Sequence, residues 1–171
     1  PVQVTPALVA RVRDDPKVCR HLHIPLQAGD DEVLAAMHRP YRIAEFLDRV
    51  ERAKAEIPGL GLSTDVIVGF PGETREQFAA TLAVVERVGF SKLHVFRYSQ
   101  RPDTPAATMP DQVGDAEKKA RARELIALGN ELRRRFHEHH LGRSVENPRV
   151  VEPDGEKGEH RHEGERSHDE R

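Results

Sequence analysis

The chain has 171 residues, a formal net charge of −2, a hydrophobic fraction of 37% and a charged fraction of 33%. This length allows one domain with a hydrophobic core. The small net charge excludes a global attraction to nucleic acid or to an anionic membrane, so a nucleic-acid contact would need a local basic face. No apolar run approaches the ~20 residues that span a bilayer, and no signal peptide is visible. A single cysteine, Cys19, excludes an internal disulfide framework and fits a reducing cytosol. We therefore expect a cytoplasmic protein without membrane contacts. Because the chain starts at Pro1 rather than at Met, we also expect it to be a piece of a longer protein.

The first part of the chain predicts three helices and one strand. Thr5 is a typical N-cap residue, and Pro6 is favoured at the first helical position. Residues 21–27 alternate between polar and apolar side chains, which predicts a strand. A turn at residues 28–31 leads into a short helix. The apolar spacing after Ile43 then predicts an amphipathic helix of about four turns, stopped by a Pro-Gly pair.

The most informative stretch is residues 63–74, read as STDVIVGFPGET. The β-branched residues 66–68 predict a buried strand, and a Gly-Phe-Pro-Gly turn follows at once. Thr74 then opens a helix, with Gln77 as its partner in a capping box. A strand that ends in a glycine turn and feeds a helix is one βα unit of a parallel α/β protein. Ligands of such proteins bind at the carboxyl ends of the strands, so the turn also predicts where a ligand lies.

The second part predicts a helix that ends at Gly89, a third strand over residues 92–98 and a proline-rich loop over residues 101–113. A long helix follows from Asp115 to about His140. The resulting alternation of helices and strands implies right-handed crossovers and a parallel sheet. Three strands are too few to close a barrel, and a parallel sheet needs both faces covered. We therefore expect a partner half outside this chain.

Three segments, in their order and spacing, carry a family signature: HLHIPLQAGDDEVLAAMHRPY, STDVIVGFPGETREQF and FRYSQRPDTPAATMPDQV. Together they resemble the radical S-adenosylmethionine (radical SAM) methylthiotransferases, which insert sulfur and a methyl group at an unactivated C–H bond. The resemblance covers about residues 4–142. Its last segment is most similar to the branch that acts on threonylcarbamoyladenosine next to the tRNA anticodon, whereas related branches act on isopentenyladenosine in tRNA or on a ribosomal-protein aspartate.

The resemblance implies a domain organisation. Residues 1–141 are expected to form the C-terminal half of a radical SAM partial TIM barrel, an α/β fold of parallel βα repeats with a long C-terminal helix. Residues 142–151 resemble the degenerate start of an RNA-binding β-domain, and residues 152–171 are expected to be a disordered, charged, His-rich tail.

The resemblance also implies two kinds of [4Fe–4S] cluster in the full-length family member. The family's C-x-x-x-C-x-x-C motif holds the cluster that binds and reductively cleaves S-adenosylmethionine, and further cysteines hold an auxiliary cluster. Neither set of cysteines is present here, and Cys19 cannot replace them. The expected partner is therefore the missing N-terminal half of the barrel.

The residues expected to contact S-adenosylmethionine follow the strands, where the family binds its cofactor. They are Gln27, Gly29, Asp65, Gly69, Phe70, Glu73, Phe96 and Tyr98. Glycine lets a backbone approach the adenine ring, and a carboxylate in the strand before the turn could reach hydroxyl groups. The chain departs from the family at Ala28 and Asp30, where two serines are usual. The alternative interpretation of these positions is a buried strand and an ordinary strand–helix turn, with Asp30 or Asp31 as the helix cap and a solvated Glu73.

Basic residues provide candidate contacts with tRNA, and histidines raise the question of a metal site. Arg101 in the loop and Lys119 and Arg123 on the long helix are the expected RNA contacts, by pairing with phosphate. The alternative is an exposed loop and a solvated helix face, because Glu alternates with Lys and Arg. The strand histidines, at positions 21, 23 and 94, are expected to be hydrogen-bonded core or barrel-lumen residues rather than metal ligands. Asp103 replaces a family glycine at a position that needs a positive φ, which Asp tolerates better than most residues.

The leading hypothesis is a fragment of a methylthiotransferase that modifies a tRNA adenosine derivative next to the anticodon. The fragment would supply S-adenosylmethionine-binding loops and the wall of the substrate channel, and it would be inactive alone. One alternative is a non-catalytic α/β remnant of a truncated gene. The other is a tRNA-binding module that uses the basic helix over residues 117–136.

Overall fold

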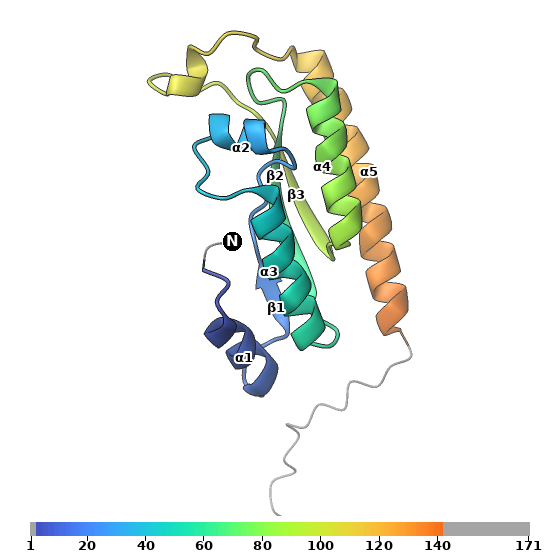
Figure 1. Ribbon diagram of the computed structural model, residues 1–171. Coiled ribbons are helices and arrows are strands. Elements are labelled where there is room, and N and C mark those ends of the chain that lie inside the picture. The colour runs from blue at the N-terminus through green and yellow to red at the C-terminus, as the bar shows by residue number, and fades with distance from the viewer. Residues whose placement is uncertain (1–2, 142–171) are drawn as a thin grey trace, which may run out of the picture.

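A computed structural model describes residues 3–141 (Figure 1). The elements in chain order are α1 Pro6–Asp14, β1 His21–His23, α2 Asp31–Ala36, α3 Ile43–Glu56, β2 Gly61–Val68, α4 Arg75–Val88, β3 Lys92–Arg97, the 3₁₀ turn η1 Pro105–Ala107 and α5 Asp115–His140. This order confirms the predicted alternation of helices and strands. The segments expected at residues 142–151 and 152–171 lie outside the described residues. None of the helices over residues 3–141 is long and apolar enough to cross a membrane.

The three strands form one parallel sheet in the order β1-β2-β3. Leu22 pairs with Leu62, and Val66 pairs with Val95. Each connection between neighbouring strands contains a helix, so the sheet is built from successive βα units as the sequence predicted. All three strands therefore end at the same edge of the sheet, toward the end of the molecule where α2 and η1 lie (Figure 1).

The first strand is shorter than predicted. Its ladder ends at His23. Ile24 N–H still donates to the Ser63 carbonyl, but Leu26 N–H donates to the Thr64 side chain instead of to a backbone carbonyl of β2. The chain returns to the sheet at Gln27, which forms an isolated bridge with Val66 and has φ of 66°. Gln27 N–H donates to the Asp65 carbonyl, and Ile67 N–H donates to the Gln27 carbonyl. These bonds fix Gln27 beside β2 in a left-handed conformation that a non-glycine residue rarely adopts.

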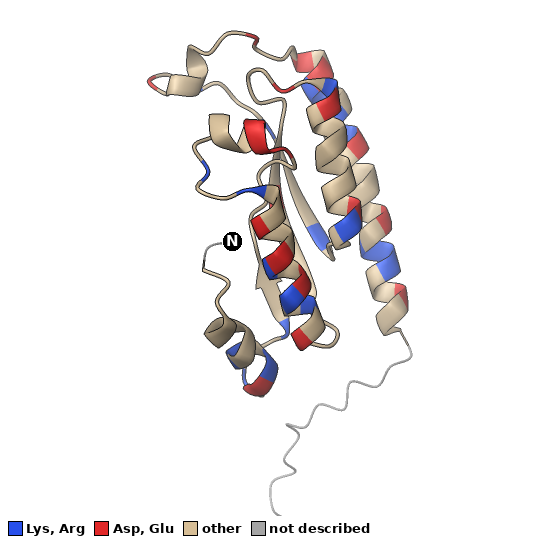
Figure 2. Cartoon of the chain, viewed as in Figure 1, with Lys and Arg blue, Asp and Glu red and all other residues tan. Residues whose placement is uncertain are grey.

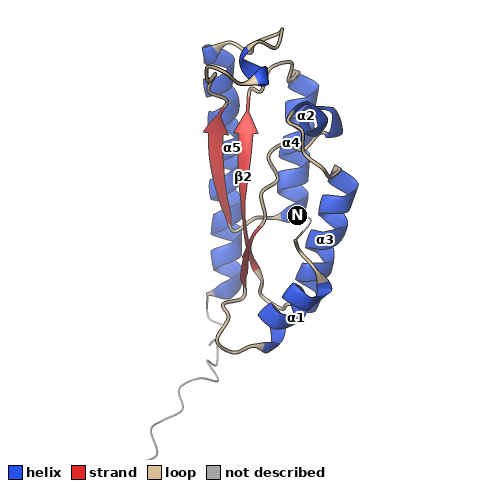
Figure 3. Ribbon diagram, turned by 90° about the vertical axis from the view of Figure 1, so that its left-hand side faces the viewer, coloured by secondary structure: helices blue, strands red, loops and turns tan. Residues whose placement is uncertain are grey.

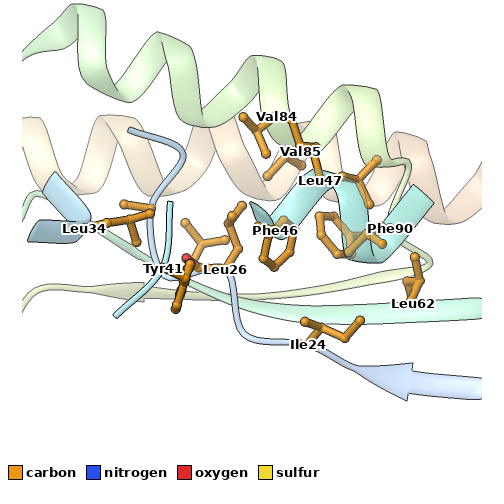
Figure 4. Packing of buried hydrophobic residues seen from close by; sticks show 14 of the residues in the cluster. Ile24, Leu26, Leu34, Tyr41, Phe46, Leu47, Leu62, Val84, Val85 and Phe90 are labelled. Atoms are coloured by element: carbon orange, nitrogen blue, oxygen red, sulfur yellow. Dashed lines mark hydrogen bonds between the residues drawn. The ribbon is translucent and has the colours of Figure 1, made fainter. Parts of the chain in front are cut away.

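Helices cover one face of the sheet, and the core lies between them and the strands (Figure 3). Alternate residues of β2 point toward the helices and are buried, among them Leu62, Val66 and Val68. Phe46 of α3 and Phe90, which precedes β3, are fully buried and lie together against this face (Figure 4). The apolar spacing that predicted α3 and α4 therefore corresponds to the stripes that these helices bury.

The opposite face of the sheet has no helix packed on it among the described residues (Figure 3). It carries the other set of β2 side chains, Ser63, Asp65 and Ile67, and their register partners on β3 include His94 and Phe96. Phe96 is 52% exposed although it lies in a strand. This face, which we call the open face, corresponds to the barrel lumen that the sequence predicted.

Gly29 is a packing residue between the loop after β1 and α4. A Cβ at this position would lie 2.4 Å from Thr81 Cα. The Gly29 N–H donates to Thr81 Oγ1 at 2.9 Å, and this threonine is fully buried. The absence of a side chain is thus needed for a close approach of two backbones, one of the recurring uses of glycine.

The substitution Gly29→Ala is expected to lower the free energy of unfolding by about 1–3 kcal/mol, because backbone atoms of α4 cannot move aside as a flexible side chain could. Urea denaturation followed by circular dichroism measures the loss. Gly114→Ala is the control: nothing lies within 4 Å of an added Cβ there. Equal losses in the two variants would contradict the packing role of Gly29.

Candidate functional site

A cavity of about 730 Å³ lies at the carboxyl ends of the strands. Its wall includes Gln27 after β1, Asp65 and Ile67 of β2, and Phe96 and Arg97 at the end of β3. The loop over residues 99–109 and the residues after α2 complete it. The volume lies in the range of about 300–1,000 Å³ that is typical of small-molecule sites. The position is the one that the sequence predicted for a ligand.

Six of the predicted site residues line this cavity, and five do not. The lining residues are Gln27, Asp65, Phe70, Phe96, Tyr98 and Arg101. The others are Gly29, Gly69, Glu73, Lys119 and Arg123. Gly29 packs against α4 as described above, whereas Gly69 and Glu73 shape the turn behind the cavity. Lys119 and Arg123 lie on an exposed face of α5.

Phe70 and Tyr98 form an aromatic corner of the cavity. Their ring centroids are 5.3 Å apart in an edge-to-face arrangement. The Lys118 ammonium lies 5.4 Å from the Tyr98 ring on the side of α5. The Tyr98 hydroxyl oxygen is buried and has no hydrogen-bond partner among the described residues. An unpaired buried hydroxyl costs free energy.

The turn after β2 is held by a buried network centred on Glu73. Glu73 Oε2 accepts hydrogen bonds from Gly69 N–H at 2.6 Å and from Arg121 Nη1 at 2.8 Å. Arg121 also donates to the Glu73 carbonyl and to Glu117. The Glu73 side chain is 1% exposed and that of Arg121 is 6% exposed. The expected alternative of a solvated Glu73 is therefore wrong.

Gly69 takes a left-handed conformation in this turn, with φ of 72°. A Cβ there would lie 2.4 Å from Lys118 Cγ. The glycine thus allows α5 to lie directly over the turn. Burial raises the pKa of Glu73 above its ordinary value of 4.5, although the Gly69 N–H and the Arg121 guanidinium act in the opposite direction.

The strand histidines lie near the open face, as predicted for lumen residues. His23 Nδ1 lies 2.9 Å from Ser63 Oγ, and the rings of His23 and His94 meet edge to face at 5.9 Å. His21 is exposed at the start of β1. Over residues 3–141, no group of three or more His, Cys, Asp or Glu side chains is arranged to hold a metal ion. Cys19 is exposed and precedes β1, so it lies at the sheet edge opposite to the cavity.

The basic surface of α5 is smaller than its sequence implies. Lys118 and Arg121 are buried against the turn after β2. Arg134 and Arg135 pair with Glu131, which lowers the pKa of that carboxyl to about 2. Positive and negative residues alternate along the visible side of α5 (Figure 2). In the described part of the chain, the exposed basic residues of α5 outside ion pairs are Lys119, Arg123 and Arg133.

Sequence reasoning missed two arginines at the cavity. Arg39 follows α2 and Arg97 ends β3, and both line the cavity together with the predicted Arg101. All three are exposed, and none forms an ion pair with a described residue. We call them the rim arginines. Their position at the ends of a helix and a strand was the available signal, since such ends form ligand sites in parallel α/β folds.

The loop beside the cavity confirms one expectation about its backbone. Asp103 has φ of 65°, the left-handed conformation that its place in a glycine position implied. Thr104 Oγ1 donates to the Arg101 carbonyl, and Gln100 donates to the Ala107 carbonyl at the other end of the loop. These bonds hold the loop, including Arg101, against the cavity opening.

Comparisons with known proteins agree with this geometry. The sequence model of the radical SAM superfamily matches residues 2–85. Among curated proteins, a tRNA-2-methylthio-N(6)-dimethylallyladenosine synthase of Thermoanaerobacter pseudethanolicus is 46% identical over 132 residues, which cover 77% of this chain and 28% of that protein. The enzyme of the same name from a Nocardioides strain is 45% identical over 157 residues, 92% of this chain and 32% of that protein. The chain belongs to the radical SAM methylthiotransferase family. It spans less than a third of the length of these relatives.

A solved structure supports the same fold. Coproporphyrinogen III oxidase from Escherichia coli, described as a radical SAM enzyme, superposes with a TM-score of 0.54 and 25% identity, over 66% of this chain and 27% of that one. The predicted fold class is thereby confirmed. The expected threonylcarbamoyladenosine branch is not confirmed, since the relatives named above carry the dimethylallyladenosine name.

The residues of this chain fit one of the two cofactors that the resemblance implies. Aromatic walls at Phe70, Phe96 and Tyr98 and a carboxylate at Asp65 fit the adenosine end of S-adenosylmethionine. They do not fit a [4Fe–4S] cluster, because the chain has one cysteine and it lies at the other edge of the sheet.

The substitution Arg121→Met is expected to lower the free energy of unfolding at pH 7 by about 3–5 kcal/mol, because it leaves the buried Glu73 carboxylate without its partner. A carboxyl whose pKa is raised on folding favours the folded state as it is protonated. Part of the loss should therefore be regained as the pH falls from 7 toward 4.5. Urea denaturation at both ends of this range measures it.

Two further variants serve as controls for this prediction. Arg75→Met removes an ion pair with Glu124 that is largely exposed, so its cost should stay below about 1 kcal/mol. Adding Glu73→Gln to Arg121→Met should restore part of the stability at pH 7. A loss that does not depend on pH and is not relieved by Glu73→Gln would show that the ion pair is not what stabilises the turn.

Proposed function

We propose that this chain supplies the cofactor-binding and substrate-facing loops of a cytoplasmic tRNA methylthiotransferase. The cavity at the carboxyl edge of the sheet would hold the adenosine end of S-adenosylmethionine. A [4Fe–4S] cluster held by cysteines outside these residues would bind and reductively cleave that cofactor. The observation that carries the proposal is the joining of residues from all three strand ends, Gln27, Asp65 and Phe96, in one cavity of a radical SAM fold.

Each wall of the cavity would have a separate task in binding. Phe70 and Tyr98 present aromatic surface to the adenine ring, and their edge-to-face contact fixes their orientation. Asp65 presents the one carboxylate among the lining residues, an acceptor for hydroxyl groups. Gly69 and Glu73, which do not line the cavity, would act by holding Phe70 in place. Gly29 would act in the same indirect way through α4.

The nucleoside that is modified is proposed from the relatives. The two relatives described above carry the dimethylallyladenosine name, so we propose a dimethylallyladenosine substrate in place of the threonylcarbamoyl derivative. The rim arginines support an RNA substrate. They place three guanidinium groups, unpaired with any carboxylate of residues 3–141, around the cavity, where the phosphates that flank an inserted base would lie.

A chimera tests this function. This chain replaces the matching segment of the Thermoanaerobacter pseudethanolicus enzyme, and the purified chimera is incubated with an anticodon stem-loop RNA. Mass spectrometry of digested RNA is expected to detect 2-methylthio product from dimethylallyladenosine and none from threonylcarbamoyladenosine. The isolated chain, treated with iron and sulfide, is expected to form no stoichiometric cluster and no product, because it lacks the cysteines. A folded chimera with cluster absorbance and no product from either RNA would favour the non-catalytic remnant.

The rim arginines give a second test, by RNA binding alone. Arg39→Gln, Arg97→Gln and Arg101→Gln are each expected to weaken binding of the stem-loop. Each should also reduce the slope of log affinity against log salt concentration by about 1, because one phosphate contact is lost. Fluorescence anisotropy at several salt concentrations measures both quantities.

The matched controls for the rim arginines are Arg123→Gln and Arg133→Gln, which remove exposed charges from α5. They should leave the affinity and the slope unchanged. If these two substitutions weaken binding and the rim substitutions do not, the alternative of a tRNA-binding module built on α5 would replace this part of the proposal.

A further inference from the structure

Three polar side chains on the open face, those of Ser63, His23 and Asp65, form a contiguous polar cluster across β1 and β2. Ser63 and Asp65 are two residues apart on β2 and point to the same side, and His23 is the register partner of Ser63 on β1. His23 Nδ1 lies 2.9 Å from Ser63 Oγ, and His23 Nε2 lies 3.4 Å from Asp65 Oδ2. With a proton on Nε2, the Ser63 hydroxyl donates to Nδ1, and Nε2 lies within ion-pair distance of the Asp65 carboxylate.

Only one residue of this polar cluster reaches the cavity. Asp65 lines the cavity, whereas His23 and Ser63 do not. The Asp65 side chain is 31% exposed, and the Ser63 residue is 3% exposed. The His23 side chain, which is 42% exposed, thus contacts Asp65 from outside the set of residues that line the cavity. The ring of His94, on the strand at the other side of β2, packs edge to face against the His23 ring and limits its movement.

We infer that His23 is a positioning residue that holds the Asp65 carboxylate for the ribose hydroxyls of an adenosine ligand. The inference rests on the proposed function, because it takes the aromatic corner of Phe70 and Tyr98 as the place of the adenine ring. A carboxylate that accepts hydrogen bonds from a ribose hydroxyl is a recurring device of nucleotide-binding α/β folds. Such a carboxylate discriminates well only when its own orientation is fixed by neighbouring groups.

A comparison of ligands separates positioning from a merely structural role. The affinity of the 171-residue chain is measured by ligand-detected NMR for adenosine, 2′-deoxyadenosine and 3′-deoxyadenosine. The unaltered chain is expected to bind adenosine about tenfold more tightly than at least one deoxynucleoside, because a hydrogen bond to a charged acceptor is lost. His23→Leu should reduce this ratio to about 2 and leave the affinity for that deoxynucleoside unchanged. His23→Gln, whose amide can still donate to Asp65, should retain most of the ratio.

The control is His21→Leu, which removes a histidine from the same strand two residues away and should leave the ratio unchanged. Asp65→Asn gives the affinity ratio that is expected when the carboxylate itself is lost. If His23→Leu weakens all three nucleosides equally, or if it leaves the ratio at the unaltered value, the positioning role is overturned while the proposed function stands. If the unaltered chain binds none of the three nucleosides, the proposed function fails and this inference fails with it.

Discussion

The buried ion pair of Glu73 and Arg121 is the interaction on which the candidate site depends. It joins the turn after β2 to α5, two segments far apart in the sequence, and its carboxylate also accepts the Gly69 N–H. The Arg121 guanidinium lies over the Phe78 ring as well, so the charge is surrounded by packed groups. Buried ion pairs often add little stability relative to apolar residues. The contribution of this one is mainly geometric, since it holds the turn that carries Phe70.

The same arrangement explains why α5, whose sequence is rich in Lys and Arg, mainly packs against the turn after β2 instead of presenting a basic surface. Lys118 and Arg121 are buried because the Tyr98 ring lies beside the Lys118 ammonium and the Glu73 carboxylate lies beside the Arg121 guanidinium. In addition, Gly69 has no side chain to keep α5 away. Farther along α5, arginines are paired with glutamates of the same helix. The unpaired positive charge next to the cavity comes instead from the rim arginines, which belong to loops and strand ends.

Local sequence signals predicted most of the fold. The cap at Thr5, the capping box of Thr74 with Gln77 and the left-handed C-cap at Gly89 all occur as expected, because each depends on a few neighbouring residues. The early end of β1 and the roles of Gly29 and Glu73 were not predictable in this way. Each of them depends on contacts with α4, α5 or β2, which lie tens of residues away in the chain. The family motifs placed residues at the cavity edge but could not tell which of them touch a ligand.

The open face of the sheet carries many polar side chains for a surface that no described helix covers. Aliphatic side chains would make an uncovered sheet prone to pair with other sheets. Beside Ile67 and Phe96, this face carries imidazoles, a hydroxyl and a carboxylate that contact one another across the strands. Polar groups of this kind are favourably hydrated, and removing water from them costs free energy. A barrel completed around it would therefore enclose a wet interior, in which water molecules remain next to the reacting groups unless a substrate displaces them.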